Sequence, residues 1–247
     1  MATRRIHIGS RRSVALRGVS RLHQRPKRGH WPRHRHDRAY VAVITDGGYF
    51  ESGDTGRWRL EAGDFVFHSA FEAHANLVST SRVVNVPLPM DAELPPVFRV
   101  ADPDAAIKAA AARSADVVHH LQPCETSEPL MLDWPDELAK YLREQRGSIR
   151  SWAETVKLTG PAISRGFRSV FGTTPSRYRL EERTRKAIRG IVAGGLSLAD
   201  QALASGFSDQ AHMTRAVRAL TGTTPGDLRR IKFVQDSGGR SPRRYWF

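Results

Sequence analysis

Three histidines and a tyrosine are spaced in the sequence in a way that suits ligand binding. In the stretch "GHWPRHRHDRAYVAVITDGG", His34, His36 and Tyr40 alternate with other residues, and alternating residues share one face of a β-strand. His74 follows in "GDFVFHSAFEAHANL", so three imidazoles can converge on one place. Imidazole nitrogens either coordinate an ion such as zinc, iron or manganese, or hydrogen-bond to neighbours and to an organic ligand.

A second stretch, "GFSDQAHMTRAV" at residues 206–217, carries groups that suit contact with nucleic acid. Its apolar residues have the spacing of a buried helix face, and the opposite face holds polar side chains and one small residue, namely Asp209, Gln210, Ala211, Thr214 and Arg215. Amide, hydroxyl and guanidinium groups of this kind hydrogen-bond to base edges and phosphates. An amphipathic surface helix has a polar face in any case, so the stretch alone leaves simple exposure to water open.

The charge distribution favours an anionic partner for the C-terminal part of the chain. The 247 residues include 39 Lys and Arg against 25 Asp and Glu, a net charge of +14. Residues 1–40 hold 12 basic and 1 acidic residue (+11), residues 41–136 hold 6 and 15 (−9), and residues 137–247 hold 21 and 9 (+12). An acidic middle and a basic C-terminal half predict two domains with different partners.

The remaining composition predicts a soluble protein of the cytoplasm. Cys124 is the only cysteine, so no disulfide can form within the chain, as is usual in a reducing compartment. The first 20 residues contain no apolar run of the ~7–15 residues that a signal peptide needs. No stretch approaches the ~20 apolar residues of a membrane-spanning helix.

The histidines fall in a part of the chain, from about residue 17 to residue 89, that predicts short strands and tight turns. The stretches "AYVAVITDGGYF", "GRWRLEAGDFVFH" and "SRVVNVPL" are rich in β-branched and aromatic residues. Asp46-Gly47-Gly48 and Glu61-Ala62-Gly63-Asp64 have the composition of turns. This part therefore predicts an antiparallel barrel or sandwich.

Helices are predicted after the proline-rich stretch "PLPMDAELPPVF". Asp102 as N-cap and Pro103 at the first helical position begin a helix that continues through "DAAIKAAAARSADVVHHL". We expect the domain boundary in the looser segment that follows, at residues 122–135.

From residue 136 onward the sequence is helical and contains an internal repeat with an offset of fifty residues. The motif "GTTP" occurs at 172–175 and again at 222–225, and Ser164-Arg165 falls on Thr214-Arg215. Each copy predicts a helix, a turn with an apolar anchor, and a second helix that starts with polar residues. A long helix, "PSRYRLEERTRKAIRGIVAGG", lies between the copies. A helix, a tight turn and a second helix form a helix-turn-helix unit, whose second helix presents its first residues to the DNA major groove.

The stretch "GLSLADQALASGFSDQAHMTRAVRALTGTTPGDLRR" resembles the C-terminal signature of AraC/XylS-type transcription regulators, which carry two such units joined by a long helix. The resemblance covers residues 136–232 and implies that the second unit reads DNA with the five residues named above. In the first unit, "LTGPAISRGFR", it implies reading positions at Gly160, Pro161, Ala162, Ser164 and Arg165. Pro161 and Ala162 offer no polar side chain, so we expect the first unit to read few bases. Arg165 and Arg215 can each form a bidentate contact with guanine.

The two histidine stretches resemble the two motifs of cupins, and a cupin-like barrel often serves as the sensor of AraC-type regulators. Three positions depart from the cupin pattern: Tyr40 stands where a cupin enzyme has a glutamate ligand, and Ser69 and Phe71 replace a proline and a glycine. Without that carboxylate we expect no metal, no cofactor and no catalytic residue. We expect instead an effector pocket for a small organic molecule, lined by His34, His36, Tyr40 and His74.

The expected architecture is multidomain β + α: an N-terminal cupin-like antiparallel β-barrel and a C-terminal all-α double helix-turn-helix domain. The expected segments are a sensory barrel (1–100), a helical connector (101–135), an AraC-type domain (136–234) and a flexible basic tail (235–247). The expected partners are double-stranded promoter DNA, a small-molecule effector, a second copy of the chain and RNA polymerase, and no membrane. Two alternatives stay open: a metal-dependent cupin enzyme with a helical appendage, and a nonspecific basic nucleic-acid binder.

Overall fold

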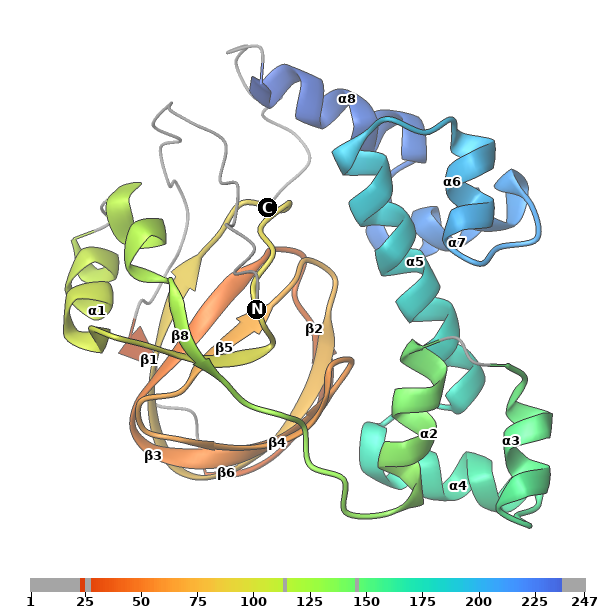
Figure 1. The fold of residues 1–247 in the computed structure, drawn as a ribbon, viewed down its shortest axis with the longest axis horizontal. Coiled ribbons are helices and arrows are strands. Elements are labelled where there is room, and N and C mark those ends of the chain that lie inside the picture. Colours follow the sequence, from red (N-terminus) through yellow and green to blue (C-terminus); the bar gives the residue numbers. More distant parts are fainter. Residues whose placement is uncertain (1–22, 25–27, 113–114, 145–146, 237–247) are drawn as a thin grey trace. The chain divides into compact units, whose positions relative to one another are not determined.

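The computed structural model describes residues 23–24, 28–112, 115–144 and 147–236 (Figure 1). All but the first two residues of the predicted basic tail, 235–247, lie outside the described residues. The chain divides into two compact units, residues 1–175 and 176–247. This division falls at residue 175, where a long helix begins. The boundary expected from the sequence, at residues 122–135 between the β part and the helical part, stays a prediction.

The first unit contains one eight-stranded sheet in which every pair of neighbouring strands is antiparallel. Its strands are β1 (His23–Gln24), β2 (Gly29–Arg35), β3 (Tyr40–Gly53), β4 (Gly56–Glu61), β5 (Phe65–His68), β6 (Ala73–Pro87), β7 (Val97–Val100) and β8 (Pro123–Thr126). The two long strands, β3 and β6, pair along their whole length. Strands β1 and β2 pair with β6, strands β4 and β5 pair with β3, and β7 and β8 extend the sheet beyond β5. The antiparallel β class predicted for this part is therefore confirmed.

The sheet is not a closed barrel. Among the described residues, strand order runs β1-β6-β3-β5-β7-β8, with β2 beside β6 and β4 beside β3, and it does not return to its first strand. The predicted antiparallel β-barrel is therefore confirmed only as an antiparallel sheet, because no described pairing joins the end strands, and the cupin identity of the sheet stays a prediction.

Strand β3 is longer than the sequence suggests. Asp46-Gly47-Gly48, expected to be a turn, lies inside β3, where the register with β6 shifts between Ile44 and Asp46 and again between Gly48 and Tyr49. Gly47 has a φ of 69° and packs so closely on β6 that a Cβ atom would overlap the carbonyl of Thr80. Here the glycines form bulges that bend a continuous strand. The second expected turn, at residues 61–64, is present, with Gly63 at a φ of 94°.

The sheet buries apolar residues on both faces. One face carries Val41, Val43, Phe65 and their neighbours, and it is covered by α1 (Pro103–Ala111) and the 3-10 helix η1 (Ala115–His120). The predicted N-cap is confirmed, because Asp102 Oδ1 accepts a hydrogen bond from the backbone of Ala105 at 2.9 Å. The single long helix predicted for residues 103–121 is instead divided in two, so that α1 and η1 contribute to the same core. The opposite face carries Ala42, Ile44, Trp58 and Leu60.

Three helices complete the first unit: α2 (Trp134–Arg143), α3 (Ile149–Thr155) and α4 (Gly160–Phe171). Helix α2 is tied to the sheet by Arg57 of β4, which donates to both carboxylate oxygens of Asp136. Gly166 allows α4 to pack closely on α2, since a Cβ atom there would overlap the ring of Trp134.

The second unit is helical throughout its described residues, as predicted. Its elements are α5 (Pro175–Ala193, whose first residue belongs to the first unit), α6 (Leu198–Ala204), α7 (Gln210–Thr221) and α8 (Pro225–Asp236). Helix α5 ends before Gly194 and Gly195, both at positive φ, as the sequence predicts. The core of the second unit includes Tyr178, Ile191, Met213 and Val217, each fully buried.

Candidate functional site

Helices α6 and α7 form a helix-turn-helix unit in the second compact unit of the chain. Ser197 caps α6 by accepting from the backbone of Asp200. The turn places Gly206 at a φ of 82°, and the Phe207 amide then donates back to the carbonyl of Ala202 at 2.9 Å. Phe207 is buried, so it anchors the turn to the core and fixes where α7 begins.

The residues predicted to read DNA in this unit lie on or beside the solvent face of α7. Gln210, Ala211 and Arg215 are exposed in α7, and Thr214 is half-buried. Met213 and Val217 face the core with no exposed surface. Short exposed side chains at the N-terminus of α7, followed by an arginine one turn later, are what base contact requires.

Asp209 has a structural role that the sequence interpretation missed. It is the N-cap of α7 and accepts a hydrogen bond from the backbone of His212 at 2.7 Å, and it also accepts from the hydroxyl of Ser208 at 2.9 Å. These hydrogen bonds lower the pKa of Asp209. Aspartate directly before a helix is a common N-cap, so the signal was in the sequence.

Helices α3 and α4 repeat the arrangement in the first compact unit. Thr159 is the N-cap of α4, and the Leu158 amide donates back to the carbonyl of Ala153 at 3.2 Å, as Phe207 does in the second copy. The burial of residues 161–170 matches that of residues 211–220 position by position. The turn of the first copy is one residue shorter, because α3 and α6 differ by 49 positions whereas α4 and α7 differ by 50.

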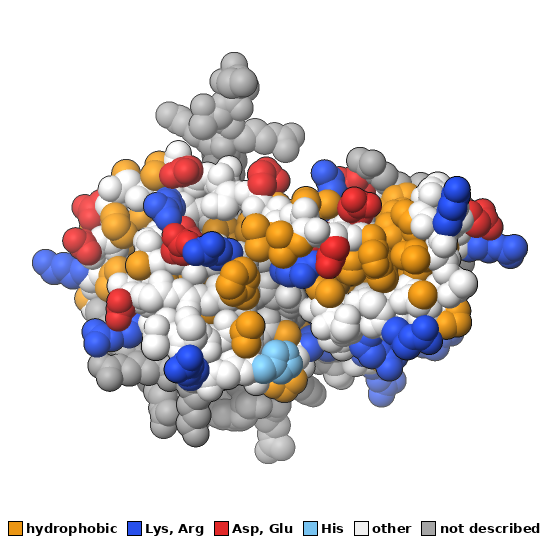
Figure 2. Space-filling model, turned by 90° about the horizontal axis from the view of Figure 1, so that it is seen from below, with side chains coloured by type: hydrophobic (Ala, Val, Ile, Leu, Met, Phe, Trp, Pro, Cys, Tyr) orange, Lys and Arg blue, Asp and Glu red, His pale blue; other side chains and the backbone are white. Residues whose placement is uncertain are grey.

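The predicted reading residues of the first copy are also accessible. Gly160, Pro161 and Arg165 are exposed, and Ala162 and Ser164 are half-buried. The structure thus places Arg165 of α4 and Arg215 of α7 at equivalent, exposed positions. Figure 2 shows further basic side chains spread over the surface of the helical part of the chain.

The residues predicted to line an effector pocket lie together in the sheet. The His34 ring centroid is 5.0 Å from that of His36 and 4.5 Å from that of His74, and the rings of His36 and Tyr40 are also 5.0 Å apart. His34 and His74 are paired across β2 and β6. His74 is buried, while the other three side chains are half-buried.

Three further residues join this cluster that the sequence interpretation missed: Glu51, His68 and Glu72, all buried. The His68 ring lies 4.3 Å from that of His74 and stacks on Tyr40 at 4.7 Å. Glu72 lies 3.3 Å from His68 Nδ1, and its other oxygen accepts from the backbone of Ser69 at 3.0 Å. We call these seven residues, His34, His36, Tyr40, Glu51, His68, Glu72 and His74, the histidine cluster.

Burial perturbs the titration of the cluster. It lowers the pKa of His36 to about 4, with a further contribution from the charge of His34, and lowers the pKa of His74 well below its usual value. It raises the pKa of Glu51 to about 7. Burial also works against protonation of His68, but the carboxylates of Glu51 and Glu72 outweigh it and raise the pKa of His68.

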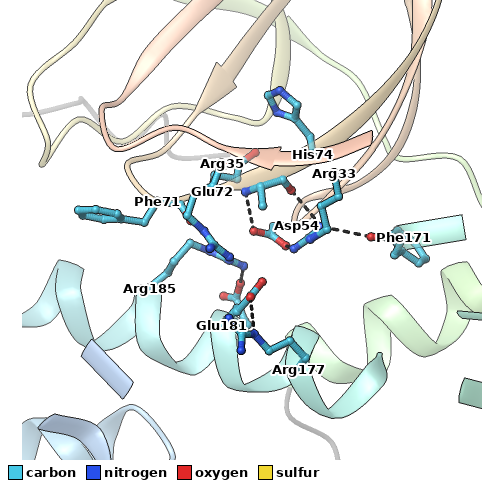
Figure 3. A network of polar contacts seen from close by, with 12 residues as sticks. Arg33, Arg35, Asp54, Phe71, Glu72, His74, Phe171, Arg177, Glu181 and Arg185 are labelled. Carbon is cyan, nitrogen blue, oxygen red and sulfur yellow. Dashed lines mark hydrogen bonds and ion pairs between the residues drawn. The ribbon is translucent and has the colours of Figure 1, made fainter. Parts of the chain in front are cut away.

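Arg33 connects the strand that carries His34 with helix α4 (Figure 3). Its guanidinium forms an ion pair with the buried carboxylate of Asp54 and donates to the carbonyl of Ala73 at 3.2 Å. The same guanidinium donates to the carbonyl of Phe171, the last residue of α4, at 3.4 Å. Arg33 directly precedes His34, and Ala73 directly precedes His74. The contacts of Arg33 therefore link the backbone beside the histidine cluster with the end of α4.

Two duplicated, capped helix-turn-helix units with exposed arginines define a protein with a double helix-turn-helix domain. A family model described as a helix-turn-helix domain matches residues 152–231. The transcriptional activator RhrA of Rhizobium meliloti (strain 1021) is 34% identical over 119 residues, and the match covers 47% of this chain and 38% of RhrA. Residues 152–231 are therefore similar to a helix-turn-helix domain, and the chain is similar to part of a transcriptional activator, as the sequence predicts.

Three solved structures are among those similar to the chain. The DNA-binding domain of AdpA in complex with a target DNA is 20% identical, with a TM-score of 0.40 over 43% of this chain and 99% of that one. An AraC-type regulator from Chromobacterium violaceum is 27% identical, with a TM-score of 0.36 over 39% and 88%. ToxT from Vibrio cholerae strain SCE256 with bound unsaturated fatty acid is 11% identical, with a TM-score of 0.39 over 84% and 93%. No helix among the described residues has the length and apolar character needed to cross a membrane.

Proposed function

We propose that the protein is a transcription regulator that binds a specific sequence of double-stranded promoter DNA through its two helix-turn-helix units. The observation that carries this proposal is the duplication: α4 and α7 share one burial pattern and present Arg165 and Arg215 at the same position. A surface helix that only faces water has no reason to repeat both its buried and its exposed positions.

The groups available for DNA contact are of two kinds. The capped N-termini of α4 and α7 and the basic side chains around them favour phosphate, which gives affinity without sequence preference. The exposed arginines and the polar residues Gln210, Thr214 and Ser164 can reach base edges, which gives the preference. The first copy has fewer polar side chains on its reading face, so the second copy supplies most of the specificity.

Replacing each arginine by alanine tests this division. Arg215→Ala and Arg165→Ala should each remove preference at one base pair, at a cost of about 1–3 kcal/mol on the specific site, and should change binding to random duplexes far less. Arg82→Ala, which removes an exposed positive charge from β6, is the matched control. Equal losses on specific and random DNA would show that the two arginines contact only phosphate.

We further propose that the cupin-like sheet senses an effector at His34, His36, Tyr40 and His74. A ligand can act only if it binds two arrangements of the protein with different affinity. Arg33 provides a contact through which such a change would reach α4, because it holds Asp54 and Ala73 of the sheet region together with the end of that helix. In Arg33→Gln, DNA binding without effector should remain, and the response to effector should weaken. An unchanged response would remove Arg33 from the mechanism.

The proposal includes no catalytic step, and the family match is to a DNA-binding fold, which gives no support to the alternative of a metal-dependent cupin enzyme. Homodimer formation and contact with RNA polymerase stay predictions.

A further inference from the structure

The histidine cluster contains a buried carboxylate with an unsatisfied oxygen. Glu51 lies on β3, its side chain is 1% exposed, and its Oε1 has no hydrogen-bond partner among the described residues. Its other oxygen, Oε2, faces two imidazoles, with His68 Nε2 at 3.8 Å and His74 Nδ1 at 3.9 Å. A carboxylate taken out of water without a compensating positive group is strongly destabilising.

The surrounding hydrogen bonds determine which ring nitrogens are free. His34 Nδ1 lies 3.0 Å from the carbonyl of Pro32, which only accepts, so this nitrogen carries the hydrogen and the Nε2 of a neutral His34 is an acceptor. His74 Nε2 lies 3.1 Å from His34 Nε2 and must therefore donate. The Nδ1 of a neutral His74 is then left with a lone pair, and it is the atom that faces Glu51.

The contacts of His68 likewise determine which of its ring nitrogens carries the hydrogen. Its Nδ1 lies 3.3 Å from the Glu72 carboxylate and 3.1 Å from His74 Nδ1, so a neutral His68 carries its hydrogen on Nδ1, where Glu72 can accept it and leave the His74 lone pair free. Its Nε2 then carries a lone pair that faces Glu51 Oε2. Three acceptor atoms, from Glu51, His68 and His74, thus point at one buried place.

The distances match a metal ion better than a proton. A proton shared between imidazolium and carboxylate gives a contact of about 2.7–2.9 Å, well below the 3.8 and 3.9 Å found here. Ligand atoms at the ~2.1 Å bond lengths of zinc stand about 3.4 Å from one another. The two distances from Glu51 to the imidazoles exceed this by only a few tenths of an ångström. Glu72 fixes the far side of His68, and His34 fixes that of His74, as outer residues do around metal-bound histidines.

We propose that Glu51, His68 and His74 bind a divalent transition-metal ion of the zinc class, with a fourth position left for water or another ligand. Two imidazoles and one carboxylate select borderline ions such as Zn²⁺, Fe²⁺ or Co²⁺ over Ca²⁺ and Mg²⁺. These ligands differ from the three histidines, His34, His36 and His74, that the sequence brings together. Glu51, eleven positions after Tyr40 on β3, supplies the carboxylate that is missing at Tyr40, and His36 is not a ligand.

Metal titration of the full chain tests the proposal. Metal-free protein should bind one equivalent of Zn²⁺ in competition with a chromogenic chelator, and Co²⁺ should develop visible absorption bands. Ca²⁺ and Mg²⁺ should not compete. Glu51→Gln and His68→Gln should weaken Zn²⁺ binding by roughly 100-fold or more, beyond the 10–100-fold typical for losing an outer residue. His30→Gln, which changes an exposed histidine of β2 outside the cluster, is the matched control and should bind as the wild type does.

A wild type that binds no stoichiometric Zn²⁺, or a His36→Gln variant that loses binding while Glu51→Gln keeps it, would overturn the proposal. Near-UV circular dichroism of the metal-free variants shows whether they remain folded. X-ray absorption of the zinc-loaded wild type needs no variant: two imidazole ligands support the proposal, and three contradict it. The titrations contain no DNA, so their outcome is separate from that of the proposed DNA binding.

Discussion

Arg57 is expected to contribute more to stability than any exposed arginine of the sheet. It lies on β4 and donates from Nε to Asp136 Oδ1 at 3.0 Å and from Nη2 to Asp136 Oδ2 at 2.6 Å. The Asp136 side chain is only 2% exposed, so Arg57→Ala would leave a buried carboxylate without its positive partner. Since Asp136 lies in the first turn of α2, the loss loosens the junction between the sheet and the helices that follow.

The expected cost follows from the remaining contacts of Asp136. Removing one partner of a buried ion pair costs about 3–5 kcal/mol. Asp136 still accepts from the backbone of Leu132 at 2.9 Å and of Asp133 at 3.4 Å, and these donors offset part of the loss. The second partner of Arg57, Asp133, is half exposed and adds little. We therefore expect a loss near the lower end, about 3 kcal/mol.

Urea unfolding followed by tryptophan fluorescence measures the effect, since Trp58 and Trp134 lie in the two elements that Arg57 joins. The matched control is Arg59→Ala on the same strand, whose pair with Glu61 is 66% and 58% exposed and should be worth about 0–1 kcal/mol. Equal shifts of the unfolding midpoint for the two variants, at unchanged slope, would show that the buried pair of Arg57 contributes no more to stability than the exposed pair of Arg59.

Two further predictions concern the helical part. Gly166→Ala should destabilise the first helix-turn-helix unit by about 1–3 kcal/mol, because the added methyl group meets the Trp134 ring; an unchanged melting temperature would show that α2 and α4 are not packed as described. The fragment of residues 137–247 should bind the same DNA motif as the full chain, with affinity that falls steeply as salt rises. A folded fragment with no sequence preference in a mobility-shift assay would contradict the prediction that residues 137–247 carry the sequence-specific DNA binding.

The helix-turn-helix units could be predicted from sequence because their signals are local. Each signal depends on residues that are close in the sequence: the "GTTP" motif, the apolar spacing around Met213 and Val217, and Gly206. In the structure Met213 and Val217 are buried in α7, and Gly206 has a positive φ in the turn. The one-residue difference between the two turns was not predicted, because the residues that clearly match between the two copies all follow the turn.

The composition of the histidine cluster could be predicted only in part, because it depends on bulges in β3. Simple alternation from Tyr40 puts even-numbered residues on the inner face, as Ala42 and Ile44 are, and would turn Glu51 outward. The register shift between Ile44 and Asp46 adds one residue to β3 and reverses the alternation along it, so that Tyr49 and Glu51 face inward instead. His68 was within reach of sequence reasoning, since it follows Val66 by two positions on the same strand face.

Selection of bound duplexes from a random library by the full chain shows whether the two helix-turn-helix units read DNA together. Recognition helices that enter successive faces of the major groove predict an enriched motif of two blocks about 10 base pairs apart. Arg215→Ala should lose one position from one block, and Arg165→Ala should lose one position from the other. A protein that binds the library tightly at low salt yet enriches no sequence would contradict this joint reading, and would identify the chain as a nonspecific basic nucleic-acid binder.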